Sequence, residues 1–394
     1  MKRNYYARSM SLLLSIATVL TVTTGCSSSK STQAAAAAPA QTSSTAAAES
    51  KASAAADTGK LPAADVAEQG YDHYDKAVTY QDAESKLGPM PKISKELKIG
   101  YVCKTFENEF WRMQKEGAEE AAKKLNAAGY KVTMDVRAAQ QESDEQGQLA
   151  ILSDMVNKKY DGILLSPISD GNLVPGIEEA AKSNIQMTVV MDAFVPNVDN
   201  TVGAWHYHAG EQAAEWISKK SGGKGEVAII QGLPKSPAAR ERTNGFKAWF
   251  AKNNPDMKIV AVQNADWDRM KAKEIADIWM KQYPDLKGIY ANNDTMAMGA
   301  LESIKTANKV GKCLIVGTDG TSEAIKSIKA GELDASINFY PYYMAQIGTE
   351  MLIRKLGGQT VPKVIYAPQG VVEKSNADKN PEEVIGWKGY NFEK

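Results

Sequence analysis

Leu286–Ile304, LKGIYANNDTMAMGALESI, predicts a strand, a polar turn and a helix in succession. Ile289 and Tyr290 are strand formers, and the run at 292–295 consists of residue types that cap helices. Apolar residues at helical spacing follow from Met298 onward. In an open α/β sheet such a turn lies at the carboxyl ends of the strands, where ligands bind. The stretch therefore indicates the ligand-facing edge of a parallel sheet.

The same pattern recurs along the chain. Strand patterns lie at 97–104, 130–136, 161–167, 186–193, 201–204, 225–232, 258–265, 286–293 and 313–320. Helical patterns separate them, which predicts an α/β fold with parallel sheets covered on both faces. The first four strands have counterparts displaced by about 127 residues. We therefore expect two similar doubly wound lobes, one after the other, with a shared ligand cleft.

The amino terminus has the features of an export signal. In residues 1–25, basic residues precede an apolar core at 10–22, which is too short for a comfortable membrane span. Gly25-Cys26 after this core resembles a bacterial lipobox, in which the cysteine is lipidated, although Thr23 stands where Leu is usual. We expect Cys26 to anchor the exported protein to the membrane; the alternative is an ordinary signal peptide with a chance cysteine.

The residues after Cys26 form a spacer. Residues 26–60 are rich in Ala, Ser and Thr and are expected to be a disordered linker. Residues 61–95 carry several tyrosines and are expected to be a partly ordered extension. Cys103 and Cys313 lie on different predicted lobes, so two buried free thiols are favoured over a disulfide. Lys+Arg and Asp+Glu number 47 each, which gives no support for nucleic acid as a partner.

Polar and aromatic side chains follow most of the predicted strands. The candidates are Asn108, Phe110, Trp111, Asp192, Arg242, Trp267, Asn293 and Asp319. Carboxylates accept hydrogen bonds, the guanidinium donates in a planar fork and amides do both, a mixture that suits vicinal hydroxyls. Flat aromatics can cover the C–H faces of a sugar or polyol. Each residue alone could be a helix cap, a solvated charge or a core aromatic, but together they predict a binding site.

These motifs carry a family resemblance. They are NEFW at 108–111, SPAARERTNG at 236–245, ADWDR at 265–269, the turn at 292–298 and VGTDGT at 316–321. From about residue 98 to about 372, the chain resembles the periplasmic sugar-binding proteins of the ribose-binding type. The resemblance implies a monomer whose two lobes close on one sugar and deliver it to an ABC permease, without cofactor or metal. It also implies sugar contacts for the eight candidates.

The resemblance also implies a domain organisation. The type I periplasmic binding protein fold joins its lobes by three chain crossings, expected here near Ala204, Phe339 and Ala367. The first lobe is then 96–204 plus 340–366, and the second is 205–339 plus 367–394.

Four departures concern the ligand. Ribose binders have Asn where Ser166 stands, Arg where Ala193 stands, Asp near Trp205 and Gln near Phe339. Ser166 and Phe339 are therefore added to the candidate site. The loss of these polar contacts disfavours ribose as the ligand and predicts another neutral monosaccharide or a polyol.

Other functions fit less well. The chain has no nucleophile elbow, phosphate loop or His-Glu-x-x-His motif, so we expect no enzyme. A sugar-responsive repressor would need a DNA-reading segment where the export signal stands. A receptor that presents a sugar or furanose-like signal to a membrane sensor remains an alternative. His206 and His208 have the spacing of two metal ligands on one strand, but no further ligand accompanies them, so no metal is expected.

Overall fold

The computed structural model describes residues 69–191, 195 and 197–392. The chain divides into two units, Met1–Thr58 and Gly59–Lys394, and every described residue belongs to the second. The predicted export signal, Cys26, the predicted linker and Asp192 lie outside the described residues. No helix within the described ranges is long and apolar enough to cross a membrane.

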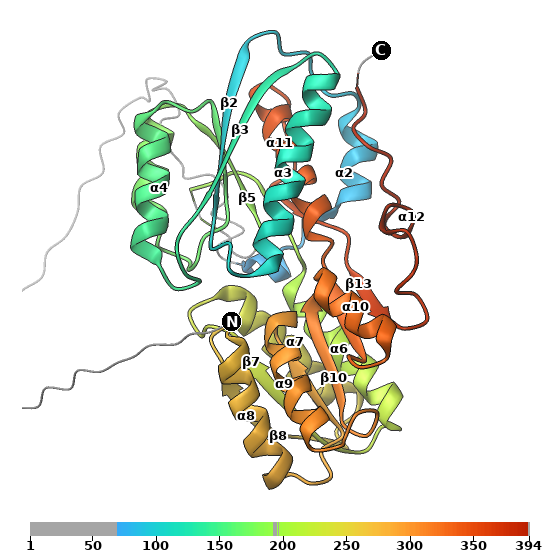
Figure 1. The fold of residues 1–394 in the computed structure, drawn as a ribbon. Helices are drawn as coiled ribbons and strands as arrows, with labels where there is room; N and C mark the ends of the chain where they lie inside the picture. Colours follow the sequence, from blue (N-terminus) through green and yellow to red (C-terminus); the bar gives the residue numbers. More distant parts are fainter. Residues whose placement is uncertain (1–68, 192–194, 196, 393–394) are drawn as a thin grey trace, which may run out of the picture. The chain divides into compact units, whose positions relative to one another are not determined.

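The first sheet has seven strands, all parallel (Figure 1). Their order is β1 (Val78–Thr79), β12 (Val364–Tyr366), β6 (Thr201–Gly203), β5 (Gln186–Val190), β4 (Gly162–Leu165), β2 (Glu96–Cys103) and β3 (Lys131–Ala138). Of its central strands, β4 is buried from end to end and β5 is buried after its first residue, as expected for a sheet that is covered on both faces.

The second sheet has six strands and the same internal order. The strands are β13 (Gly370–Glu373), β11 (Ala335–Asn338), β10 (Leu314–Asp319), β9 (Gly288–Ala291), β7 (Gly225–Gln231) and β8 (Met257–Asn264). The five from β11 to β8 repeat the order of the five from β6 to β3. The prediction of two similar α/β lobes is confirmed. Only β13 is antiparallel to its neighbour, which the sequence did not predict.

Helices connect the strands. They are η1 (Tyr71–His73), α2 (Tyr80–Leu87), α3 (Glu109–Ala127), α4 (Glu145–Asn157), α5 (Val174–Lys182), α6 (His206–Ser221), α7 (Pro237–Asn253), α8 (Arg269–Gln282), α9 (Asp294–Thr306), α10 (Ser322–Ala330), α11 (Pro341–Leu356) and α12 (Pro381–Ile385). Many begin just after a strand, at a residue whose side chain accepts a hydrogen bond from the first turn, such as Asn108, Asp268 or Thr321. The polar turns predicted from the sequence are thus these helix starts.

The chain passes between the two sheets at three points. The passages follow β6 at Ala204, β11 at Phe339 and β12 at Ala367. All three lie at strand ends, so both sheets present the carboxyl ends of their parallel strands to the same region.

Both ends of the described chain pack on the first lobe. The extension contributes β1 to the first sheet, and its Tyr80 ring stacks on Trp387 at 5.6 Å. Further on, the Met90 amide donates to the Asn391 carbonyl at 2.7 Å. The expected assignment of 367–394 to the second lobe is therefore wrong for its final part. Trp387, Tyr390 and Phe392 pack on the first lobe because the extension offers an apolar surface there.

The two cysteines of the described chain are buried in different lobes. Cys103 ends β2 and Cys313 precedes β10, and neither forms a disulfide. Burial raises the pKa of both thiols above the ordinary value. The prediction of two free, buried thiols is confirmed.

Candidate functional site

A small pocket lies where the two lobes meet at the carboxyl ends of their strands. Its lining is Lys104, Asn108, Phe110, Trp111, Glu142 and Met191 from the first lobe, and Arg242, Trp267, Asn293 and Asp319 from the second. Seven of the ten predicted ligand residues are among them. The free space between these side chains is about 20 Å³, which is room for roughly one water molecule. The walls are therefore closed on each other in this structure.

The first-lobe wall is organised around Glu142. Its carboxylate accepts hydrogen bonds from Trp111 Nε1 at 2.8 Å and from Asn108 Nδ2 at 3.2 Å. Asn108 also caps α3, because its Oδ1 accepts from the Phe110 amide at 3.0 Å. The Phe110 and Trp111 rings meet edge to face at 4.9 Å. Lys104 Nζ lies 5.4 Å from the centre of the Trp111 ring, so the wall combines aromatic faces with one cation and one carboxylate.

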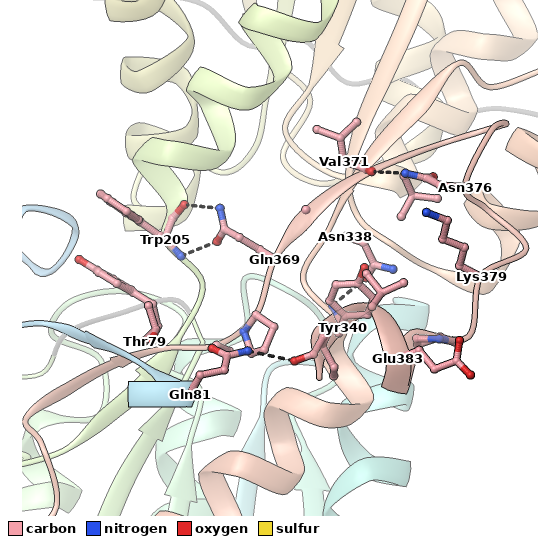
Figure 2. A pocket seen from close by; sticks show the side chains of 18 of the residues that line it. Thr79, Gln81, Trp205, Asn338, Tyr340, Gln369, Val371, Asn376, Lys379 and Glu383 are labelled. Carbon is pink, nitrogen blue, oxygen red and sulfur yellow. Dashed lines mark hydrogen bonds between the residues drawn. The ribbon is translucent and has the colours of Figure 1, made fainter. Parts of the chain in front are cut away.

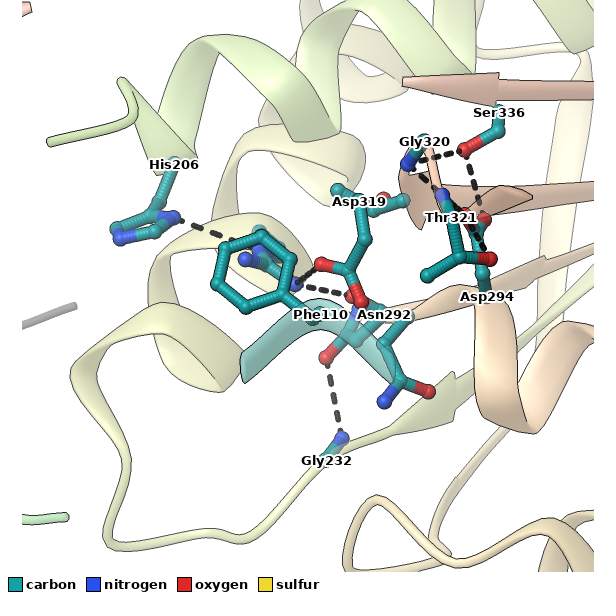
Figure 3. A network of polar contacts seen from close by, with 12 residues as sticks. Phe110, His206, Gly232, Asn292, Asp294, Asp319, Gly320, Thr321 and Ser336 are labelled. Carbon is teal, nitrogen blue, oxygen red and sulfur yellow. Dashed lines mark hydrogen bonds and ion pairs between the residues drawn. The ribbon is translucent and has the colours of Figure 1, made fainter. Parts of the chain in front are cut away.

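The second-lobe wall is organised around Arg242, whose side chain is almost fully buried. Nη1 donates to the Asn292 carbonyl and lies 3.5 Å from Asp319 Oδ1. Nε donates to His206 Nδ1 at 3.4 Å. The guanidinium also lies over the rings of Phe339, at 4.7 Å, and Trp267, at 5.7 Å. These contacts fix its plane on several sides (Figure 3).

A buried carboxylate supports the turn that carries Asp319. Asp294 accepts hydrogen bonds from the amides of Gly320 and Thr321, both at 2.8 Å, and from Ser336 Oγ at 2.7 Å (Figure 3). Burial raises the pKa of Asp294 to about 6. A Cβ at Gly317 would lie 2.2 Å from Asp294 Oδ1, so only glycine fits there. Asp294 thus has a structural role beside the pocket.

Asn293 has two roles. Its Oδ1 accepts from the Met296 amide at 2.8 Å and caps α9, which is the alternative that the sequence left open. The cap uses only the carbonyl oxygen, and the same side chain lines the pocket. Its amide nitrogen is therefore the group that Asn293 can offer to a ligand.

Two of the described candidates, Ser166 and Phe339, are not among the residues that line the pocket. Ser166 lies beneath the floor, where its Oγ is 2.9 Å from Tyr101 Oη and donates to the Val190 carbonyl at 2.7 Å. Phe339 is fully buried and supports Arg242 from below. Asp192 lies outside the described residues. These contacts explain why Ser166 does not line the pocket, because a short hydroxyl that is hydrogen-bonded on two sides does not reach into it.

Three lining residues were missed from the sequence. Lys104 directly follows β2, and Glu142 lies in the turn between β3 and α4. Both obey the same strand-end rule that identified the other candidates, and applying it to the turn after the second strand would have found Glu142. Met191 carries no polar signal. Its φ of 77° places its backbone in the left-handed region that favours glycine.

The charges of the described lining residues balance. Lys104 and Arg242 are cations, and Glu142 and Asp319 are carboxylates. Each lobe supplies one of each sign. A neutral ligand can meet both walls without leaving an uncompensated charge buried.

Polar contacts close the two lobes around the pocket. Glu109 at the start of α3 accepts hydrogen bonds from Ser322 Oγ and, at 3.3 Å, from the Glu323 amide of α10. Arg240 pairs with Asp170 at 3.0 Å. Lys235 pairs with Glu145 at 2.8 Å. Each contact joins the first lobe to the second near the pocket rim.

A larger cavity of about 960 Å³ lies at the chain crossings (Figure 2). Gln369 spans part of it and bonds both the amide and the carbonyl of Trp205, at 2.8 and 3.2 Å. None of the nine predicted ligand residues that the structure describes lines it. Its charged groups, Lys379 and Glu383, are not backed by a buried network like that of Arg242. The smaller pocket is therefore the candidate ligand site.

The two histidines of the His-x-His motif do not converge on a metal position. His206 is buried beside Arg242, whereas His208 Nδ1 lies 3.1 Å from Glu211 Oε2. Over the residues that the structure describes, no group of three or more His, Cys, Asp or Glu side chains could hold a metal ion.

Comparison with known proteins agrees with this geometry. The D-allose-binding periplasmic protein of Escherichia coli K12 is 36% identical over 66% of this chain and 85% of its own length. The ribose import binding protein RbsB of Bacillus subtilis 168 is 32% identical over 70% of this chain and 86% of its own. A solute-binding protein from Actinobacillus succinogenes 130z, solved with bound D-allose, superimposes with a TM-score of 0.67 at 29% identity. That match covers 72% of this chain and 99% of the solved one.

The family assignment rests on the central part of the chain. The profile of the periplasmic binding protein domain matches residues 99–360, which include most of both lobes and every described residue of the pocket. The relatives are binding proteins, which confirms the prediction that the chain is not an enzyme. The chain belongs to the periplasmic binding protein domain family and is one of its extracytoplasmic, two-lobed solute-binding proteins.

Proposed function

We propose that the protein captures a neutral monosaccharide or polyol between its two walls and delivers it to an ABC permease. The observation that carries this proposal is the charge balance of the described pocket lining, in which Lys104 and Arg242 offset Glu142 and Asp319; Asp192, the other charged candidate, lies outside the described residues. A phosphorylated or carboxylated sugar would bring an extra anion that has no dedicated partner. Hydroxyl groups, by contrast, can both donate to the carboxylates and accept from the cations.

Aromatic rings support the same class of ligand. Phe110 and Trp111 on one wall and Trp267 on the other belong to the pocket lining. Flat rings on both walls suit a ligand whose faces carry C–H groups and whose edge carries hydroxyls. Relatives that are named for D-allose and ribose favour an aldose. We expect a hexose such as D-allose to bind more tightly than ribose, because Ser166 and Phe339 stand where ribose binders place Asn and Gln, so two polar contacts for ribose are replaced by a smaller residue and an aromatic one.

Binding and release require the walls to separate. The free space of about 20 Å³ is too small for a sugar, so we infer rotation of the lobes about the crossings at Ala204, Phe339 and Ala367. Small-angle scattering should show a larger radius of gyration without ligand than with saturating ligand. Identical profiles would contradict a hinge.

We also propose that Cys26 anchors the protein by lipid to the outer face of the cell membrane. Gly25-Cys26 after an apolar core, followed by a spacer, supports this assignment, and a diacylated cysteine would supply the two acyl chains that stable anchoring needs. In cell fractionation, the wild type should sediment with membranes and Cys26→Ser should not. A wild type that is fully released would contradict the anchor.

A thermal-shift panel tests the ligand class. The panel contains hexoses, pentoses, inositols and alditols, with sugar phosphates, uronic acids, amino acids and nucleosides as the other classes. A ligand at a hundredfold its dissociation constant stabilises the native state by about 2.7 kcal/mol, which should raise the melting temperature by a few degrees. Shifts from neutral sugars or polyols alone support the proposal. Shifts only from the other classes would overturn it.

A further inference from the structure

The amino-terminal extension contacts both lobes beside the pocket. Its β1 strand pairs with β12 of the first sheet. Its η1 turn meets the start of α6 in the second lobe, where the Tyr207 amide donates to Asp72 Oδ1 at 3.0 Å. In addition, Trp205 Nε1 donates to the Asp72 carbonyl at 2.9 Å. The extension lies outside residues 99–360, the part that the family profile matches.

Asp72 supplies a cap that α6 lacks. The residue before the helix, Trp205, makes no side-chain hydrogen bond to the first turn, although the first amides of a helix need partners. The Asp72 carboxylate is only 5% exposed and accepts from an amide of that turn. An acceptor at this end also matches the positive end of the helix dipole. The cap comes from a segment 135 positions earlier in the chain.

The first residue of α6 holds the guanidinium of Arg242. His206 is fully buried, and its Nδ1 accepts from Arg242 Nε at 3.4 Å. Its ring meets Phe339 edge to face at 5.8 Å, and Phe339 also lies against the guanidinium. His206 Nδ1 lies 3.4 Å from Arg242 Nε and Asp319 Oδ1 lies 3.5 Å from Arg242 Nη1, so both side chains contact the guanidinium. A shift of His206 would therefore move a group that lines the pocket.

Helices α6 and α7 also touch through their backbones. A Cβ at Gly210 would lie 2.0 Å from the Arg242 carbonyl oxygen. A Cβ at Gly245 would lie 1.9 Å from the Tyr207 carbonyl oxygen. No layer of side chains separates the two helices at these points, so there is little to absorb a displacement of the start of α6. Tyr207 therefore makes both contacts: its amide donates to Asp72, and its carbonyl oxygen packs against α7, the helix that carries Arg242.

We propose that Asp72 is a positioning residue for Arg242: by capping α6 from the extension, it sets the place of His206 and so the orientation of the guanidinium in the pocket. The proposal rests on the proposed function in that Arg242 contacts the ligand. It assigns the extension a role in binding, beyond that of a spacer to the membrane.

Two substitutions at Asp72 separate capping from charge. Burial raises the pKa of Asp72 to about 8, against the effect of the Tyr207 and His206 amides, which lower it. Asp72→Asn keeps an acceptor oxygen and is as good a cap, whereas Asp72→Ala removes it. Loss of a cap corresponds to about three- to tenfold in affinity if it is transmitted to the pocket. Asp72→Asn should stay within about twofold of the wild type.

A matched variant controls for general destabilisation of the extension. Tyr80 lies on the same segment, and its buried hydroxyl donates to Glu350 Oε2 at 2.9 Å, in the first lobe. Tyr80→Phe should lower the melting temperature without changing affinity. In an Arg242→Ala background, Asp72→Ala should cause no further loss of affinity, because the group that it positions is absent.

The test uses the purified full chain and has two readouts. Titration calorimetry with the neutral sugar that gives the largest thermal shift measures affinity. Nitrogen-15 spectra of arginine side chains, with Arg242→Lys to assign the signal, report on the Arg242 Nε–H group without any ligand. We expect Asp72→Ala to shift or broaden this signal and to weaken binding, whereas Asp72→Asn and Tyr80→Phe leave both unchanged.

The outcomes are distinct. An Arg242 signal that is unchanged in Asp72→Ala overturns the inference, whether or not a ligand is known. A changed signal with unchanged affinity also overturns it, because the altered position then has no effect on binding. If the wild type binds no sugar or polyol, the proposed function fails, while the spectra still decide whether Asp72 places Arg242.

Discussion

The two walls of the pocket carry the same kinds of groups but hold them in different ways. On the second lobe, Arg242 and Asp319 are almost fully buried and belong to a network that includes the backbone of Asn292 and the carboxylate of Asp294. On the first lobe, Glu142 is partly exposed and is held by contacts with its near neighbours in the pocket. A buried network loses more when one member is removed, because the remaining groups stay desolvated and unpaired.

This difference predicts unequal sensitivity to substitution. Changes in the second-lobe network should affect both binding and folding. Changes on the first-lobe wall should act mainly on binding. Changes to the exposed ion pairs between the lobes, such as Arg240–Asp170, should have weak effects, because water replaces the lost partner.

The largest expected effect on affinity is that of Arg242→Ala. A hydrogen bond to a charged group contributes about 1.5–3 kcal/mol, so binding of the neutral ligand should weaken by roughly 10- to 150-fold. Titration calorimetry measures the loss. Lys247→Ala, an exposed change on the same helix, is the control and should have no effect. If Arg242→Ala weakened affinity by less than about threefold, the result would show that Arg242 does not contact the ligand.

Asp294→Asn tests the support beneath the second wall. An amide cannot accept all the hydrogen bonds that the carboxylate receives, so we expect a loss of about 1–3 kcal/mol in the free energy of unfolding. The raised pKa, about 6 against an ordinary 3.8, adds a pH dependence. Between about pH 4 and pH 6, the Asp294 carboxyl group keeps its proton in the folded protein but has lost it in the unfolded chain. The contribution of the group to stability is therefore greatest below about pH 4 and declines as the pH rises to about 6.

Thermal unfolding of the wild type and Asp294→Asn across this pH range measures both effects. The stability difference between the two proteins should shrink as the pH rises from 4 to 7. A difference that is constant with pH would show that Asp294 has an ordinary pKa in the folded protein.

Glu142→Gln tests the first wall. Glutamine keeps an oxygen that can accept from Trp111 or Asn108 but loses the charge, so the hydrogen bonds weaken by about 1 kcal/mol and affinity should fall about three- to tenfold. The melting temperature without ligand should stay within a degree or two, because Glu142 is partly exposed. A large drop in stability would contradict the contrast between the walls.

The smallest effect is expected at the rim. Asp170→Asn breaks the ion pair with Arg240, whose side chains are 57% and 42% exposed. Exposed pairs contribute about 0.2–1 kcal/mol, so affinity should fall by less than about fivefold, and by less still at high salt. An effect as large as that of Arg242→Ala would mean that closure depends on the rim more than on the pocket.

The fold was largely predictable because most of the described strands are followed by a helix. The strands that were missed, β1, β11, β12 and β13, have two to four residues each. Such short segments carry no periodicity of their own. They become strands because distant parts of the chain pair with them, as β1 does with β12.

The site was predictable where a residue follows a strand directly. Asn293 and Asp319, at or next to the ends of β9 and β10, were found in this way, whereas Arg242 lies within α7 and was found from the SPAARERTNG motif. Ser166 obeys the same rule but bonds to Tyr101, a contact that depends on how neighbouring strands pack. The role proposed for Asp72 has no sequence signal, because its partner lies 135 positions away.

The charge balance of the pocket is tested most directly by calorimetric titration of one aldose and its uronic acid at several salt concentrations. The two ligands have the same ring and differ by one carboxylate. We predict that the neutral aldose binds at least about tenfold more tightly than the uronate, which is roughly 1.4 kcal/mol, with an affinity that changes little between low and high salt. Tighter binding of the uronate, weakening as salt is added, would contradict the account and show a pocket built for an anion.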